Sequence, residues 1–289
     1  MAGNHGPQGI MSSDADCAYP GRLSPQAVRE GLKTRWLGQQ AIYCFDAVES
    51  TNTEASNLAR QGAVEGTVVL AEAQRKGRGR LGRSWISHPG TGVCLSVILR
   101  PQTPPEWGGR LTLTAGVAVA AAIAETGIRP ELKWPNDIMI SDHKVGGILT
   151  EASFGGNSIG PVIVGVGINV DTNSEDFPVS IRNIATSLRL SSGIEVSRVA
   201  LVQAFLRQLE QWYELFCKGS FGAILETWRE YETVLGGLVE VYLPDSRLQG
   251  MAENIDSDGA LLVRDKKGRL HRIMGGDVVR CRVRERQRL

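Results

Sequence analysis

The stretch from Arg75 to Arg83, RKGRGRLGR, places five cations and three glycines in nine residues. Glycines let the backbone approach a ligand closely and offer amide groups to an anion. Arginine side chains add planar forks of donors that suit phosphate and carboxylate groups. The residue types and their spacing therefore predict a loop that wraps a small anionic ligand.

Two other interpretations of this loop are disfavoured. The segment from Gly77 to Gly82 fits the pattern G-x-G-x-x-G, but a dinucleotide-binding turn must open a helix that receives the pyrophosphate. Here RSWISHPGTG follows, and its proline and glycines do not support a helix. Nucleic-acid binding is disfavoured because 32 Lys and Arg face 31 Asp and Glu, and only Trp85 interleaves the cations.

Composition indicates a globular protein of one large domain and one smaller one, with 289 residues and 42% apolar residues. The five cysteines and four histidines show no metal-type spacing, so we predict reduced structural thiols, no protein metal site and a cytoplasmic location. No signal peptide opens the chain, and residues 1–22 are expected to be a disordered lead. The apolar run LTLTAGVAVAAAIAETGI predicts a buried helix and not a membrane span.

The elements that position the loop follow from local signals. Ser24-Pro25 predicts a helix start, and we expect that helix to continue to about Gly38. Further helices are expected at 50–62, 108–127, 197–217 and 221–234, with a loop and a short helix over 174–193. Strands are expected at 41–48, 66–74, 92–100, 131–140, 144–153 and 158–170, with Cys94 in a core strand. The fold class is therefore α+β: a mixed sheet with flanking helices over 23–235.

The texture changes at Gly236, where short strand patterns alternate with Gly and Asp turns. Residues 236–289 are expected to form a small barrel-like β-domain. The alternating arginines of the tail RCRVRERQRL predict one solvated face of a last strand, followed by a frayed end.

Four further motifs accompany the loop in a fixed order. They are ESTN (49–52), KWPND (133–137), KVGGILTE (144–151) and VGVGINV (164–170). The ordered set closely resembles the biotin protein ligase family over about residues 40–170, and 236–283 is similar to that family's SH3-like domain. The loop alone would indicate only an anion-binding site.

The resemblance implies a two-step reaction with biotin and ATP as substrates and Mg²⁺ accompanying the ATP. Biotin is first activated to biotinyl-5′-AMP with release of pyrophosphate. It is then transferred to a specific lysine of a biotin carboxyl carrier protein domain, such as that of acetyl-CoA carboxylase.

The resemblance also implies roles for individual residues. The catalytic residues are Lys144, which stabilises the carboxylate and the developing phosphorane, with Arg80 and Asp137. Whether Asp137 orients Lys144 or accepts a proton from the incoming lysine is left open. Biotin-binding residues are Ser50, Thr51, Asn52, Gln74, Arg78, Gly79, Lys144, Gly147 and Gly165. Adenylate-binding residues are Arg80, Arg83, Trp85, Lys133, Asn136 and Asn169.

Many bacterial relatives carry a winged helix before the catalytic domain, whereas about 23 residues precede Ser24 here. We therefore expect a ligase without sequence-specific DNA binding. Two alternatives stay open from the residues: a lipoate or octanoyl ligase, and a non-catalytic biotin-binding regulator. A homodimer is plausible from the resemblance, and ordering of the Arg75–Arg83 loop on ligand binding is expected from its glycines and like charges.

Overall fold

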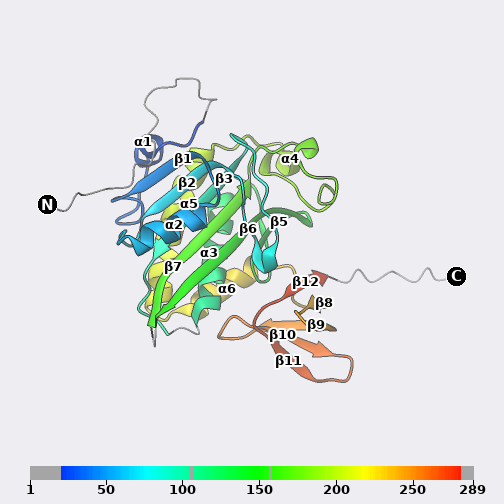
Figure 1. Cartoon of the computed structure of the whole chain (residues 1–289). Helices are drawn as coiled ribbons and strands as arrows, with labels where there is room; N and C mark the ends of the chain where they lie inside the picture. The colour runs from blue at the N-terminus through cyan, green and yellow to red at the C-terminus, as the bar shows by residue number, and fades with distance from the viewer. Residues whose placement is uncertain (1–20, 105–106, 156–157, 281–289) are drawn as a thin grey trace.

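The computed structural model describes residues 21–104, 107–155 and 158–280, and its strands form two sheets (Figure 1). The larger sheet has the order β1-β2-β3-β7-β6-β5-β4; β1 and β2 are parallel and its other pairs antiparallel. Its strands are β1 (Ile42–Val48), β2 (Val68–Gln74), β3 (Gly92–Leu99), β4 (Glu131–Lys133), β5 (Asp137–Ile140), β6 (His143–Gly155) and β7 (Ser158–Asn169). This confirms the expected mixed sheet and α+β class.

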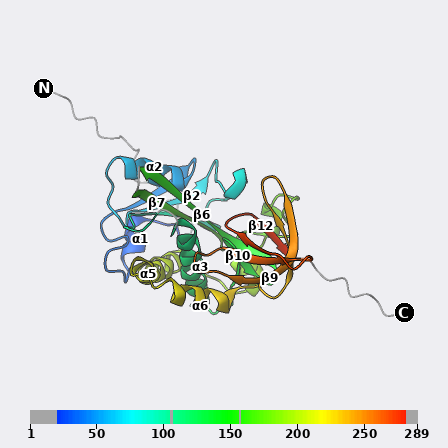
Figure 2. The same ribbon diagram turned by 90° about the horizontal axis from the view of Figure 1, so that it is seen from below.

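Helices cover both faces of the large sheet (Figure 2). One face packs against α3 (Gly108–Ala124), with α5 (Arg198–Cys217) and α6 (Phe221–Tyr231) outside it. The other face carries α2 (Thr51–Arg60), whose Ala55 and Ala59 pack on Val69, Ile98 and Ile163. Helix α2 contacts β2, β3 and β7, and so it covers only part of that face.

The Ala-rich helix α3 is the buried helix that the sequence predicts. Its residues Ala115, Val117, Ala118, Val119 and Ala120 are fully buried. Small side chains allow close approach to both the sheet and α5, so the helix forms the centre of the core. Within the described part of the chain, no helix is long and apolar enough to cross a membrane.

The expected first helix is much shorter than predicted: α1 spans only Pro25–Arg29. The prediction was wrong beyond that point. Further along, at residues 35–37, a distant side chain accepts the hydrogen bonds of the backbone N–H groups that a longer helix would have used. The buried carboxylate of Glu210 on α5 accepts hydrogen bonds from the N–H groups of Arg35, Trp36 and Leu37 at 2.8–3.0 Å. The chain is therefore bent around α5 and not wound into a helix.

The expected N-terminal lead lies outside the described residues except for Gly21 and Arg22. Both of these are anchored: the Gly21 carbonyl accepts a hydrogen bond from Arg198 at 2.9 Å, and Arg22 pairs with Asp46. The tail from 281 onwards also lies outside them. The described cysteines, Cys44, Cys94 and Cys217, are free thiols, and Cys94 is 2% exposed on β3 as predicted.

The second sheet forms the C-terminal domain, with the order β11-β10-β9-β8-β12. Its strands are β8 (Leu238–Tyr242), β9 (Arg247–Ile255), β10 (Leu261–Asp265), β11 (Leu270–Ile273) and β12 (Asp277–Arg280). Trp134 Nε1 donates to the Gly259 carbonyl at 3.0 Å, and Arg110 pairs with Asp258 at 2.6 Å. These contacts fix the small domain at one end of the large sheet.

Candidate active site

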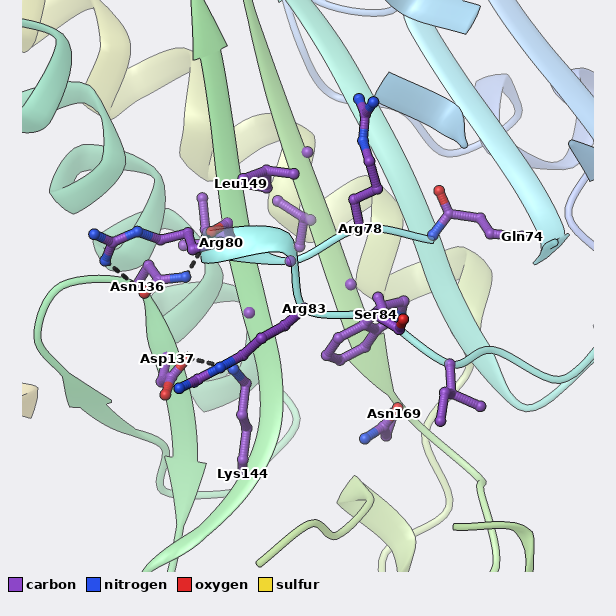
Figure 3. Close-up of a pocket in the computed structure, with 18 of the residues that line it drawn as sticks. Gln74, Arg78, Arg80, Arg83, Ser84, Asn136, Asp137, Lys144, Leu149 and Asn169 are labelled. Atoms are coloured by element: carbon purple, nitrogen blue, oxygen red, sulfur yellow. Dashed lines mark hydrogen bonds and ion pairs between the residues drawn. The ribbon is translucent and has the colours of Figure 1, made fainter. Parts of the chain in front are cut away.

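A cavity of about 220 Å³ opens on the α2 face of the large sheet. It is lined by residues from all five motifs, which lie between Ser50 and Asn169 in the sequence. Figure 3 labels residues from the Arg75–Arg83 loop and from the motifs KWPND, KVGGILTE and VGVGINV. Alternate residues of a strand face the same side. Gly165, Gly167 and Asn169 of β7 therefore line the cavity together, next to Gly147 and Leu149 of β6. The floor is thus two antiparallel strands with little side-chain volume.

One end of the cavity is a chain of polar groups at the start of α2. Gln74 Oε1 accepts from the Thr51 backbone N–H at 2.8 Å and from the Thr51 hydroxyl at 3.1 Å. The Ser96 hydroxyl lies 2.8 Å from Thr51 Oγ1 and 2.6 Å from Asn52 Oδ1. Ser50 is the N-cap residue of α2, yet its side chain makes no capping hydrogen bond. Its buried hydroxyl lines the cavity instead.

Two glycines of β7 provide space for neighbouring side chains. A Cβ atom at Gly165 would lie 2.1 Å from Asn52 Oδ1, and one at Gly167 would lie 2.5 Å from the Trp85 indole ring. Real Cβ atoms do not approach other atoms so closely. Gly165 is therefore required for the position of Asn52, and Gly167 for the position of the indole against the sheet.

The cationic loop lies over this floor and is tied down at three points. Figure 3 shows the side chains of Arg78, Arg80 and Arg83 pointing in different directions. They contact three separate acceptors, which are Glu151 on β6 (3.0 Å), Asn136 before β5 (3.2 Å) and Asp277 on β12. The loop contains one 3₁₀ turn, Arg80–Gly82, and the next regular element is β3. The expectation that no α-helix follows Gly82 is confirmed.

The cavity is also lined by an ion pair between Lys144 and Asp137 (Figure 3). The two residues come from adjacent antiparallel strands, β6 and β5. The Lys144 Nζ lies 3.4 Å from where a Cβ of Gly147 would be, so the side chain runs across the glycine backbone. The Lys144 backbone is held by the segment after β7: its N–H donates to the Ile184 carbonyl at 2.8 Å.

Arg80 is the most enclosed cation of the loop. Burial lowers the pKa of its guanidinium, and the negative charges of Asp277 and Asp137 act in the opposite direction. A guanidinium is so basic that it remains charged at neutral pH. The cavity therefore holds a fixed positive charge close to the Lys144–Asp137 pair.

All but one of the predicted site residues line the cavity. Lys133 lies on β4 and is absent from the lining. Trp85 and Asn169 both line the cavity, and the Asn169 side chain donates a hydrogen bond to the Thr186 carbonyl at 3.0 Å. Among the described residues no cluster of three or more His, Cys, Asp or Glu could hold a metal ion.

Sequence reasoning missed several contributors. Ser96 carries a fully buried hydroxyl on β3. The only sequence feature that could have indicated its role is a serine within an otherwise apolar strand. Glu151 is the last residue of the KVGGILTE motif, but no role was predicted for it; it contacts both Asn52 and Arg78. Asp277 comes from the other domain, and no local pattern connects it with the loop. Further lining residues are Ser84, Ile86, Ile148, Leu149, Val166, Phe177, Ile181, Ile184 and Ala185.

Comparison with known proteins agrees with this fold. Residues 44–169 match the Biotin/lipoate A/B protein ligase family, and residues 235–280 match the Biotin protein ligase C terminal domain. The class is thus a two-domain acyl ligase of this family. The C-terminal match and the similar proteins below are all biotin protein ligases, and the chain belongs to that family.

The biotin–[acetyl-CoA-carboxylase] ligase of Mycobacterium tuberculosis is 32% identical over 278 residues, covering 90% of this chain and 96% of that protein. The bifunctional ligase/repressor BirA of Bacillus spizizenii is 40% identical over 260 residues, covering 90% of this chain and 79% of that protein. The biotin protein ligase of Aquifex aeolicus, solved with biotin and ATP, superimposes with a TM-score of 0.72 at 28% identity. The match covers 84% of this chain and all of that one.

Proposed function

We propose that this ligase joins biotin to a carrier-protein lysine in two steps within the one cavity. In the first, a carboxylate oxygen of biotin attacks the α-phosphorus of ATP. An oxygen–phosphorus bond forms, the bond to the β-phosphate breaks, and pyrophosphate leaves. The observation that supports this most directly is a polar end and a cationic end on one glycine-lined floor.

The polar end suits the ureido ring of biotin. That ring presents two N–H donors and one carbonyl acceptor, so it needs short acceptors and donors close together. Ser50, Thr51 and Gln74 offer hydroxyl and amide groups at the start of α2. The apolar tail of biotin would then lie along β6 and β7, where Leu149 and Val166 provide apolar lining.

The cationic end suits the two anions that must meet. A carboxylate and a triphosphate repel each other, and Arg80, Arg83 and the loop amides would offset that repulsion. Lys144 would stabilise the carboxylate and the charge that develops on the phosphorus. Asp137 pairs with Lys144 and would hold its ammonium group in place. Trp85 and Asn136 would contact the adenine.

In the second step the neutral amine of a carrier lysine attacks the acyl carbon of biotinyl-5′-AMP. A carbon–nitrogen bond forms, the carbon–oxygen bond to AMP breaks, and the amine releases a proton. Mg²⁺ would enter with ATP and neutralise charge on the phosphates. The acceptor is expected to be a biotin carboxyl carrier protein domain.

The test separates the two steps. Pyrophosphate release is measured with biotin and MgATP alone, and streptavidin detects biotin on a carrier domain after that domain is added. We expect both signals, and a much weaker pyrophosphate signal with lipoate. Pyrophosphate release that is equal for lipoate and biotin would contradict the substrate assignment, and its absence with both would refute the reaction.

A further inference from the structure

Glu151 lies outside the cavity lining but contacts two residues that form it. Its carboxylate accepts a hydrogen bond from Asn52 Nδ2 at 2.6 Å, and both of its oxygens lie 3.0 Å from Arg78 Nη2. Asn52 belongs to the polar end of the cavity and Arg78 to the cationic loop. One side chain therefore connects the two halves of the site.

We propose that Glu151 is a positioning residue that holds both Asn52 and Arg78 for ligand binding. This inference rests on the proposed function, because it assigns the two contacts to biotin recognition and to closure of the loop. Glu151 does not itself touch the bound molecules; it acts through its two partners.

The contact with Asn52 fixes an amide that has little freedom. Asn52 is 3% exposed, and its Oδ1 lies over Gly165 where no Cβ could be accommodated. Its Nδ2 is shared between Glu151 and the Leu149 carbonyl at 3.2 Å. Since Ser96 contacts Oδ1 on the other side, Glu151 helps decide which way the amide faces. The side chain of Asn52 therefore presents a defined surface to the head group.

The contact with Arg78 fixes one end of the loop. Both contacts from Glu151 reach Nη2, and Arg78 also lines the cavity. The pair is partly exposed, at 48% for Arg78 and 37% for Glu151, so its free energy alone is modest. The pair acts through position: it keeps the Arg78 guanidinium beside β6 and next to Asn52, which shares the same carboxylate.

The two roles can be separated by two substitutions. Glu151→Gln keeps an oxygen that can accept from Asn52 but removes the charge that attracts Arg78. Glu151→Ala removes both. The matched control is Glu253→Gln in the C-terminal domain. Glu253 forms an ion pair with Arg264 outside the cavity lining, and the two side chains are similarly exposed, 36% for Glu253 and 43% for Arg264.

Two measurements use the full chain without ATP or a carrier protein. Trypsin cleavage at Arg78, Arg80 and Arg83, followed by mass spectrometry, reports loop opening. Calorimetry with biotin alone reports affinity. We expect Glu151→Gln to raise the cleavage rate about two- to five-fold, as for the loss of one exposed ion pair. Its biotin affinity should change less than about three-fold, because a neutral acceptor still serves Asn52.

Glu151→Ala should raise cleavage to the same extent and also weaken biotin binding roughly ten-fold, since the Asn52 amide loses its partner. Equal cleavage of Glu151→Gln and Glu253→Gln would overturn the role at the loop. Equal biotin affinity of Glu151→Ala and the unmodified chain would overturn the role at Asn52. If the unmodified chain failed to bind biotin, the proposed function itself would fail, and the two failures are therefore distinguishable.

Discussion

At the residue scale, the Lys144–Asp137 pair places two opposite charges side by side in the cavity lining. A lysine is a compact cation, suited to a charge that develops at one point during reaction. Asp137 lies on the neighbouring strand, so the ammonium group is oriented before substrates arrive. This arrangement fits a role for Lys144 in the chemical step more than in substrate binding.

Lys144→Ala is therefore expected to slow adenylate formation about 100-fold, which corresponds to roughly 3 kcal/mol of transition-state stabilisation. Biotin-dependent pyrophosphate release under single-turnover conditions measures this step. The control is Lys218→Ala, because Lys218 is an exposed lysine at the end of α5 and lies outside the cavity lining. A normal rate of adenylate formation in Lys144→Ala would remove this lysine from the first step.

Ser96 provides a second prediction at this scale. Its hydroxyl is fully buried between Thr51 and Asn52, so Ser96→Ala leaves buried oxygens with one donor fewer. The free energy of unfolding should fall by about 1–3 kcal/mol, and biotin affinity should fall as well. Urea unfolding and calorimetry test this. Ser96→Thr keeps the hydroxyl and should retain more of the affinity; equal losses in both variants would indicate that packing, not hydrogen bonding, is responsible.

At the scale of elements, the glycines of β7 decide how closely the indole of Trp85 approaches the sheet. Strand glycines usually weaken a sheet because they pack no side chain. Here β7 is central, between β3 and β6, and its neighbours supply the stability. The strand therefore tolerates the glycines, which make room for the site.

Gly167→Ala should push the indole off the sheet and reduce kcat/KM for ATP about ten-fold, as expected when one aromatic contact is lost. Steady-state kinetics with varied ATP measures the effect. Gly222→Ala on α6 is the matched control, because a Cβ there meets nothing within 4 Å. Similar kinetics for the two variants would contradict a role for the Trp85 position in nucleotide binding.

At the scale of the whole molecule, the cavity is completed by the C-terminal domain. Asp277, the first residue of β12, lines it and pairs with Arg83 of the loop. The domain is held in place by Trp134, a residue of the KWPND motif, through its bond to the Gly259 carbonyl. The motif thus serves the site on one side and the domain contact on the other.

Asp277→Asn should raise KM for ATP by a few-fold while leaving the affinity for biotin alone nearly unchanged. An exposed charge pair contributes about 0.2–1 kcal/mol, which limits the effect to roughly five-fold. Varied-ATP kinetics and biotin calorimetry make the comparison, with Glu253→Gln as the control within the same domain. A loss of biotin affinity as large as the loss for ATP would show that the substitution disturbs the whole site.

Local sequence signals identified most elements, and the family resemblance supplied the predicted site residues, all but one of which line the cavity. Strand alternation, the helix start at Ser50 and the Gly-rich spacing act over a few neighbouring residues, so they are readable without the fold. The path of the chain after α1 was not readable, because Glu210, far along the chain, binds the backbone N–H groups of residues 35–37 that a longer helix would have used. Glu151 and Ser96 were also missed, since their partners come from other elements.

The sequence by itself determined the cationic, glycine-rich composition of the loop and, through five ordered motifs, which family the chain belongs to. Only the tertiary structure decided that the three loop arginines attach to three different elements, one of them in the other domain. The reason is physical: side-chain type depends on the residue alone, whereas the partner of a charge depends on which strands the fold brings within a few ångströms.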